Sequence, residues 1–316
     1  MSHSYDYMVV RDYHGRSAQE LLSAPVDAIE GISGADAEHL RQAFGVRTVR
    51  DLAACRPFDK ARAVAAAAAP SFDPGPPPAW ATLFAEAPLA HYQASPRRYR
   101  LDYGPVWYRG RLDGTARVLV IGQDPAANEV VAHRIFIGAS GQRVQGFLAR
   151  LGITRSYTMF NTFLYPIYGQ YFGDDDEGMK DPILGFRNLM LDRVKAENPL
   201  QVVLTFGRAA RAAVEHWPGL GDLPVAHMQH PSAKDSVAQL ATWNAALDLA
   251  RPLVEPDDGA AANPAPYGQD FAEGDEADIP AFDLPFGVPS FMGKGSHAWR
   301  EDDWDEDYRQ INWRAP

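Results

Sequence analysis

Val118-Leu-Val-Ile-Gly-Gln-Asp-Pro125 is the segment that decides the fold of this 316-residue chain. Four apolar residues followed by glycine predict a buried strand that ends in a tight turn. About a hundred residues later, Leu223–Met228 predicts a second strand, and the loop after it carries His230 and Ser232. Open α/β sheets bind ligands beyond the carboxyl ends of their strands. Asp124 and His230, each just beyond a strand, therefore predict an acid/base or electrostatic pair.

Strands and helices alternate through the middle of the chain. This alternation predicts an α/β fold with a central, mostly parallel four-stranded sheet and helices on both faces. The expected strands and helices are 118–121, 142–151, 157–161, 182–197, 201–205, 208–217, 224–228 and 236–250, in the order strand, helix, strand, helix, strand, helix, strand, helix.

The composition is that of a globular chain, with 46% hydrophobic residues, enough for a core. The longest run of small apolar residues, 61–70, is mostly alanine and begins beside Lys60 and Arg62. We therefore expect no signal peptide, no membrane span and a cytoplasmic protein. We also expect a monomer. The one cysteine, Cys55, excludes an internal disulfide and is expected to be a buried structural thiol rather than a reactive one.

The net charge of -11 comes entirely from the end of the chain. Residues 255–316 hold 15 acidic and 4 basic residues, whereas residues 1–254 hold 26 of each. Residues 95–155 contain ten arginines and four acids, an excess that can contact phosphates, unless it is simply a solvated face. The arginines are Arg97, Arg98, Arg100, Arg109, Arg111, Arg117, Arg134, Arg143, Arg150 and Arg155.

Four motifs resemble those of the uracil-DNA glycosylase superfamily. Gly122–Pro125 is similar to the start of the family's first motif, and His230-Pro-Ser232 to the start of its second. Phe136-Ile-Gly-Ala-Ser-Gly-Gln142 resembles a segment of the iron-sulfur branch, while Phe160-Asn-Thr162 resembles the Leu-Asn-Thr of the main uracil glycosylases. The resemblance covers about residues 100 to 252 and is a mosaic of branches.

With only one cysteine, the chain lacks the four ligands of the iron-sulfur cluster, and we expect no cofactor. His227 stands three residues before His230, a spacing that on a strand directs the two side chains to opposite faces. We therefore expect His227 to be structural and no metal to be bound.

The resemblance implies a hydrolase that cleaves the N-glycosidic bond of deoxyuridine in DNA, releases uracil and leaves an abasic site. Asp124 would act as a base for water or as a negative charge beside the sugar, and His230 would donate to the uracil oxygen that gains charge. Phe136 would stack on the flipped base, and the amide of Asn161 would read it. Each has a structural alternative: a turn or cap aspartate, a loop histidine satisfied by backbone, a core phenylalanine and a turn asparagine.

Further contacts follow from the same resemblance. Gln123 would hold the base, and Ala126 stands where the main glycosylases have a tyrosine that excludes thymine, with Asn128 or Glu129 helping to close the pocket. The source of thymine exclusion therefore stays open, as do the residue that fills the gap left by the flipped base, the preference for single or double strands and the sensitivity to protein inhibitors. The residues expected to contact DNA are Ser232, Gly138, Gly141, Gln142, Lys234 and Arg134.

Three other segments flank this domain, which we assign to residues 100–254. Residues 1–70 predict a helical module whose Gly31-Ile-Ser-Gly34 turn resembles a helix-hairpin-helix; it would bind a DNA phosphate or be a purely structural or protein-docking pair. Residues 71–99 are a proline-rich linker and lead-in. Residues 255–316 are acidic and rich in proline and aromatics, and we expect them to be partly docked on the domain and partly disordered.

The acidic tail has two interpretations. It is a candidate autoinhibitory or partner-docking segment that competes with phosphates for the arginines, in which case truncation after Pro252 should tighten DNA binding. The alternative is a solubilising extension whose aromatics cover the core. Two further functions also remain open: a glycosylase for another damaged base, such as hypoxanthine or mismatched thymine, and a catalytically silent DNA-binding protein on the same fold.

Overall fold

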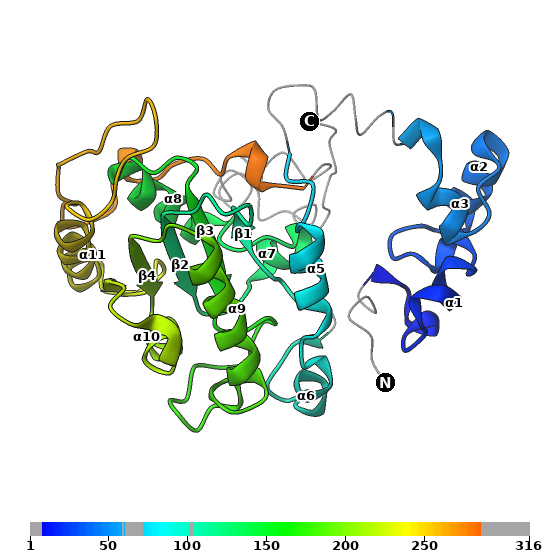
Figure 1. The fold of residues 1–316 in the computed structure, drawn as a ribbon, viewed down its shortest axis with the longest axis horizontal. Coiled ribbons are helices and arrows are strands. Elements are labelled where there is room, and N and C mark those ends of the chain that lie inside the picture. Colours follow the sequence, from blue (N-terminus) through cyan, green and yellow to red (C-terminus); the bar gives the residue numbers. More distant parts are fainter. Residues whose placement is uncertain (1–7, 59, 61–71, 102–103, 286–316) are drawn as a thin grey trace.

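The computed structural model describes residues 8–58, 60, 72–101 and 104–285. A five-stranded sheet with the order β1-β3-β2-β4-β5 lies at the centre of the α/β domain (Figure 1). The strands β2, β3, β4 and β5 are parallel, and β1 pairs antiparallel with β3. The strands are β1 (Arg109–Gly110), β2 (Val118–Gly122), β3 (Tyr157–Asn161), β4 (Val202–Phe206) and β5 (Val225–Met228).

The predicted α/β fold and mostly parallel sheet are confirmed. The four predicted strands are β2 to β5, with ends that differ by at most one residue from those expected. The fifth strand, β1, was missed because it is an edge strand of two residues, too short to show the alternation by which strands are recognised.

Helices cover both faces of the sheet, as predicted. Successive strand residues point to opposite faces, so Leu119 and Ile121 belong to one hydrophobic core, and Val118 and Val120 to the other. The first core is covered by α5 (Pro78–Ala85), α6 (Leu89–Ala94), α9 (Ile183–Glu197) and α10 (Arg208–Glu215). The second is covered by α7 (Ala127–Ala132), α8 (Ala139–Arg150) and α11 (Ser236–Ala250). Of the helices that the structure describes, none combines the length and apolar character needed to cross a membrane.

The first helices form a small module of their own (Figure 1, blue). They are α1 (Ala18–Leu22), α2 (Gly34–Phe44) and α3 (Val49–Ala53). Their core includes the buried thiol of Cys55. At the turn before α2, the backbone N–H of Ser33 donates to Asp36 at 3.1 Å. This amide, which a bound phosphate would need, is therefore already occupied by a carboxylate.

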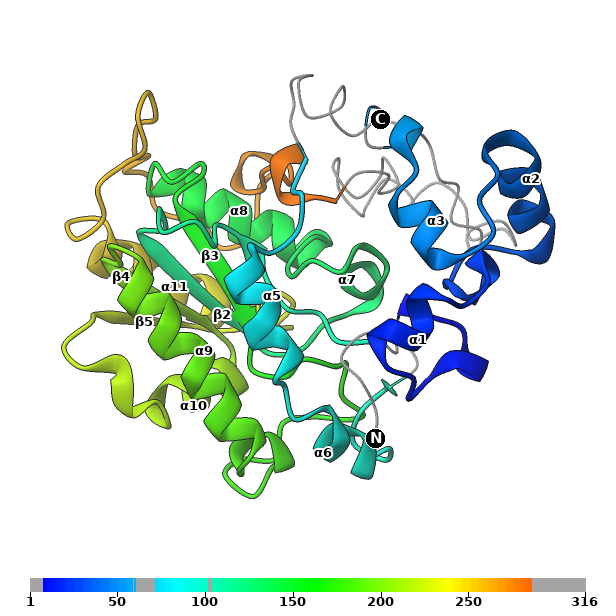
Figure 2. The same ribbon diagram turned by 45° about the vertical axis from the view of Figure 1, so that its right-hand side comes forward.

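The segments on either side of the domain pack against it. Asp73, in the proline-rich linker, accepts hydrogen bonds from Arg134 at 2.9 Å and from the hydroxyl of Tyr108. Residues 255–285 pack on the domain, and their later part lies beside α8 (Figure 2, orange). The ring of Tyr267 is 5.6 Å from that of Trp243 in α11. This part of the tail thus packs on the domain in the structure, while its predicted division into docked and disordered parts stays a prediction. The aromatics Phe286, Phe291, Trp299, Trp304 and Trp313 lie outside the described residues.

The docked tail neutralises much of the arginine excess. Asp283 pairs with both Arg109 and Arg111, and five of the ten arginines have carboxylate partners in residues 255–285. Several of these pairs are buried, so the prediction of an arginine face open to phosphates is wrong for their members. The five pairs are Arg109–Asp283, Arg111–Asp283, Arg117–Asp257, Arg143–Glu276 and Arg150–Asp275.

Candidate active site

The carboxyl ends of β2 and β3 are joined by backbone hydrogen bonds beyond the sheet. The N–H of Thr162 donates to the carbonyl of Gly122, and the N–H of Phe163 donates to that of Gln123, both at 2.9 Å. These bonds fix the loop that carries Gln123 and Asp124 to the loop that follows Asn161. The two motifs recognised in the sequence therefore lie side by side at one sheet edge.

Both carboxylate oxygens of Asp124 have donors. Oδ2 accepts from the backbone N–H of Ile167 at 3.0 Å, and Oδ1 accepts from the side-chain amide of Gln123 at 2.9 Å. Burial raises the pKa of Asp124, and these two hydrogen bonds and the charges of Arg98 and Arg100 oppose the increase. The carboxylate is thus fixed in orientation and carries a pKa closer to neutrality than an exposed aspartate, which suits a base or a charge stabiliser.

Phe136 and Asn161 meet over Gly122, and both are buried. A Cβ atom on Gly122 would lie 2.4 Å from Oδ1 of Asn161 and 2.6 Å from Cζ of Phe136. Phe136 has a φ of 53°, a left-handed conformation that a bulky residue seldom adopts. Strain of this kind is typical of functional sites. The structure therefore brings the predicted stacking ring and the predicted reading amide into one place.

The loop of Phe136 depends on a second glycine. A Cβ on Gly141 would lie 1.7 Å from the carbonyl oxygen of Phe136, so only glycine fits there. Gly138, the N-cap of α8, accepts a backbone bond from Gln142. Gln142 is itself buried, and its carbonyl accepts from Ala277 of the tail. Gly141 and Gln142 thus position the Phe136 loop and lie within the protein, and the contact of Gln142 with DNA stays a prediction.

Glu129, which the sequence offered beside Asn128 as a residue that helps to close the pocket, joins two loops of the site. Its buried carboxylate accepts from the backbone N–H of Ala126 at 3.1 Å and from that of Ile137, and burial raises its pKa. It therefore ties the first-motif loop to the loop of Phe136. The signal was present in the sequence, because a glutamate three residues into a helix often bonds back to the residue that caps it. Ala126 itself is exposed at the start of α7.

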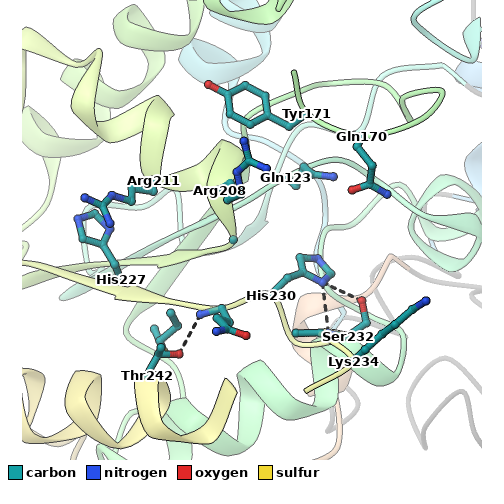
Figure 3. A pocket seen from close by; sticks show the side chains of 14 residues that line it. Gln123, Gln170, Tyr171, Arg208, Arg211, His227, His230, Ser232, Lys234 and Thr242 are labelled. Carbon is teal, nitrogen blue, oxygen red and sulfur yellow. Dashed lines mark hydrogen bonds between the residues drawn. The ribbon is translucent and has the colours of Figure 1, made fainter. Parts of the chain in front are cut away.

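His230 has a defined tautomer. Its Nδ1 accepts from the backbone N–H of Ser232 at 3.2 Å and lies 2.8 Å from the hydroxyl of Ser232 (Figure 3). Because a backbone N–H can only donate, Nδ1 is the acceptor and the proton of the neutral ring lies on Nε2. Burial lowers the pKa of His230, which keeps the ring neutral at pH 7. Nε2–H is thus the group that can donate to a substrate.

A cleft of about 680 Å³ opens at this sheet edge. Gln123 joins it to the buried groups, because it both lines the cleft and bonds Asp124. Figure 3 shows His227 beside Arg211 on one side, and His230 with Ser232 on the other. The lining residues are Gln123, Gln170, Tyr171, Gly207, Arg208, Arg211, His227, Met228, Gln229, His230, Ser232, Ala233, Lys234 and Thr242.

The remaining predicted residues divide between the cleft and the protein interior. Ser232 and Lys234 are exposed and line the cleft, whereas Arg134 is buried in its pair with Asp73, so that its contact with DNA stays a prediction. His227, expected to be purely structural, lines the same cleft as His230, while its Nδ1 lies 2.7 Å from the hydroxyl of Thr205. Within the described part of the chain, no three His, Cys, Asp or Glu side chains are grouped so as to hold a metal ion.

The segment that contains the sheet and its edge is similar to one known family. Residues 110–246 match the family described as the uracil DNA glycosylase superfamily. The match extends from β1 into α11 and includes Asp124, Phe136, Asn161 and His230. The chain matches none of the curated proteins with which it was compared.

Proposed function

Because residues 110–246 belong to the uracil DNA glycosylase superfamily, we propose that this protein hydrolyses the N-glycosidic bond of deoxyuridine in DNA. Membership points to a DNA glycosylase of DNA repair, and the choice of uracil is our proposal. The observation that carries it is the meeting of Phe136 and Asn161 over Gly122, at the same sheet edge as Asp124 and His230.

Recognition of the base follows from these two side chains. A base within a duplex cannot reach a buried amide, so the target must be flipped out or unpaired. Phe136 then stacks on it, while the amide of Asn161 donates to a uracil oxygen and accepts from the ring N–H. Cytosine presents the opposite pattern and would leave buried polar groups unpaired, a mismatch that discriminates strongly.

Cleavage requires charge to be stabilised at both ends of the breaking bond. When the bond between the sugar carbon and the base nitrogen breaks, its electron pair goes to the base and the sugar gains positive charge. The Asp124 carboxylate stabilises that charge and takes a proton from the water that attacks the sugar carbon. Nε2–H of His230 donates to the uracil oxygen that gains negative charge, a contribution worth roughly 2.7 to 4 kcal/mol.

A second substrate is favoured by one observation, the exposed alanine at position 126. An alanine here leaves open the space that a tyrosine would occupy against carbon 5 of the base. A hydrophobic pocket rejects one extra methyl by only about 1 to 3 kcal/mol without a steric clash. Weak release of thymine or of 5-substituted uracil is therefore compatible with this site.

A panel of oligonucleotides tests the proposal. Each carries one deoxyuridine, thymine mismatch or hypoxanthine, and free base is measured with EDTA present and absent. We expect rapid uracil release that survives EDTA, and an abasic strand that breaks only after alkali, because the cleft contains no lysine other than the exposed Lys234 among its described lining residues. Loss of activity with EDTA, strand breakage without alkali, or equal activity of Asp124→Asn would contradict this mechanism. DNA binding without release of any base would instead identify a silent DNA-binding protein.

A further inference from the structure

Two aromatic rings are exposed beside the cleft. The exposed fraction is 46% for Tyr168 and 67% for Phe172. Between them in the chain, Gln170 and Tyr171 line the cleft itself. Large exposed apolar side chains next to a binding site commonly mark a contact surface. We call Tyr168 and Phe172 the aromatic pair.

The segment that carries the aromatic pair is fixed before any ligand binds. The guanidinium of Arg98 donates to the carbonyls of Tyr168 at 2.7 Å and Gln170 at 3.1 Å, and it also pairs with Asp176. The backbone N–H of Tyr168 donates in return to the carbonyl of Arg98 at 2.8 Å. Because the backbone is already ordered, contacts made by these rings cost little additional conformational entropy on binding.

An arginine lies against each ring. The guanidinium carbon of Arg98 is 4.7 Å from the centroid of Phe172, and that of Arg100 is 4.8 Å from the centroid of Tyr168. Exposed aromatics next to cations are the pattern by which proteins bind single-stranded nucleic acids, with bases stacked on rings and phosphates near the charges. Of the two arginines, Arg100 is exposed and can meet a phosphate, whereas Arg98 is buried in its pair with Asp176. The exposed Asp174 and Asp175, just beyond Phe172, disfavour phosphates on that side, which favours contact of Phe172 with a base rather than with the backbone.

The aromatic pair also lies close to the proposed chemistry. Ile167, the residue before Tyr168, donates the hydrogen bond that fixes Asp124. The segment 168–172 therefore lies within reach of the nucleotides that flank a target base in the cleft. We propose that Tyr168 and Phe172 form a platform on which unpaired bases flanking the target stack, so that the preferred partner is a single-stranded stretch of DNA. This inference rests on the proposed function for the claim that the cleft receives DNA.

The test compares two oligomers of equal length and equal phosphate number, one of deoxythymidine and one of abasic sites, by fluorescence anisotropy with the full chain. Wild type should bind the thymidine oligomer about tenfold or more tightly than the abasic one, because each stacked base contributes. The double variant Tyr168→Ala/Phe172→Ala should lose this preference and keep its affinity for the abasic oligomer. Tyr168→Phe, which keeps the ring, and Leu249→Ala, which removes an exposed apolar side chain from α11, should both keep the preference.

Two results would overturn the inference. One is a double variant that folds, as judged by its thermal unfolding, and still prefers the thymidine oligomer. The other is a wild type with no preference, the outcome expected if the aromatic pair serves a protein partner instead. Neither oligomer contains deoxyuridine, so a failure of the platform is distinguishable from a failure of uracil release.

Discussion

Asp124 is held by the backbone of Ile167, whose N–H donates to Oδ2 at 3.0 Å. Because this donor is a backbone N–H, it stays in place when Asp124 is replaced by a side chain of similar shape. Asp124→Asn can therefore keep the position of the side chain while it removes the charge, which makes it a clean test of the carboxylate. We expect the cleavage step to slow by about 10² or more, with DNA binding largely intact, in a single-turnover assay. An unchanged rate would remove Asp124 from the mechanism.

The same substitution should stabilise the fold. Burial raises the pKa of Asp124, so the folded protein holds this proton to a higher pH than the unfolded chain. The stability of the fold therefore falls as the pH rises from 3.8, the ordinary pKa of aspartate, through the raised pKa of the folded state. Above that pKa, including at neutral pH, the stability stays at its reduced level. In urea unfolding, the free energy of unfolding of Asp124→Asn should exceed that of wild type at pH 7 to 8. The difference between the two proteins should shrink towards acid pH. A constant difference would show that titration of Asp124 is not its cause.

His230 should act as a neutral donor. Since its pKa is lowered from 6.5, protonation should disturb the rate only below that value, where it breaks the bond from Ser232 N–H to Nδ1. We expect His230→Ala to reduce the rate of base release by about 10². Ser232→Ala keeps the backbone N–H that donates to His230, so it should reduce the rate of base release much less. Equal losses in the two variants, measured across the pH range, would show that the hydroxyl rather than the backbone sets the tautomer.

Gly122→Ala should disable the base-reading site without a charge change. The added Cβ would lie 2.4 Å from Asn161 and 2.6 Å from Phe136, so both side chains must move. Displacements of this size cost about 10² in rate. The control is Gly34→Ala in α2, where a Cβ meets nothing within 4 Å. The comparison is made on kcat/KM for a uracil-containing oligonucleotide, and equal values for the two variants would show that Gly122 does not support the pocket.

Asn161→Asp and Ala126→Tyr test the two sides of base selection. A carboxylate can only accept, so Asn161→Asp should weaken the discrimination between uracil and cytosine. If Ala126 lines the carbon-5 side of the base, the Ala126→Tyr variant should release less thymine than wild type does. Release of uracil, cytosine and thymine is measured for the three proteins. If wild type releases no thymine and the tyrosine leaves selectivity unchanged, Ala126 does not border the base.

Much of this architecture could be predicted from sequence because its signals are local. Short, mostly apolar runs that alternate with helical segments predicted the four parallel strands, and Gly122–Pro125 and His230–Ser232 marked the sheet edge. The ion pairs could not be predicted in this way. Arg111 and Asp283 are 172 residues apart, and a local excess of arginine is the same whether its partners are phosphates or distant carboxylates. The burial of Arg134 in its ion pair with Asp73 could not be predicted for the same reason.

Asp283→Asn tests the importance of these distant pairs. Asp283 is fully buried, accepts from Arg111 and from the hydroxyl of Tyr157, each at 2.5 Å, and lies 3.7 Å from the buried Arg109. Removing one partner of a buried ion pair costs about 3 to 5 kcal/mol. Chemical unfolding should show a loss of this size, and none for Asp258→Asn, an exposed aspartate of the same segment. Truncation after Pro252 should accordingly unfold the domain rather than tighten DNA binding, and a stable, well-folded truncation would contradict this account.

The docking of residues 255–285 also has a consequence for biosynthesis. At about 5 to 20 residues per second, the 172 residues between Arg111 and Asp283 take roughly 9 to 34 s to translate. During that interval the emerging chain contains the strands and helices of the domain, while the guanidinium groups destined for its interior still lack their carboxylates. The α/β domain therefore cannot reach its final packing on the ribosome until the chain has been synthesised past Asp283.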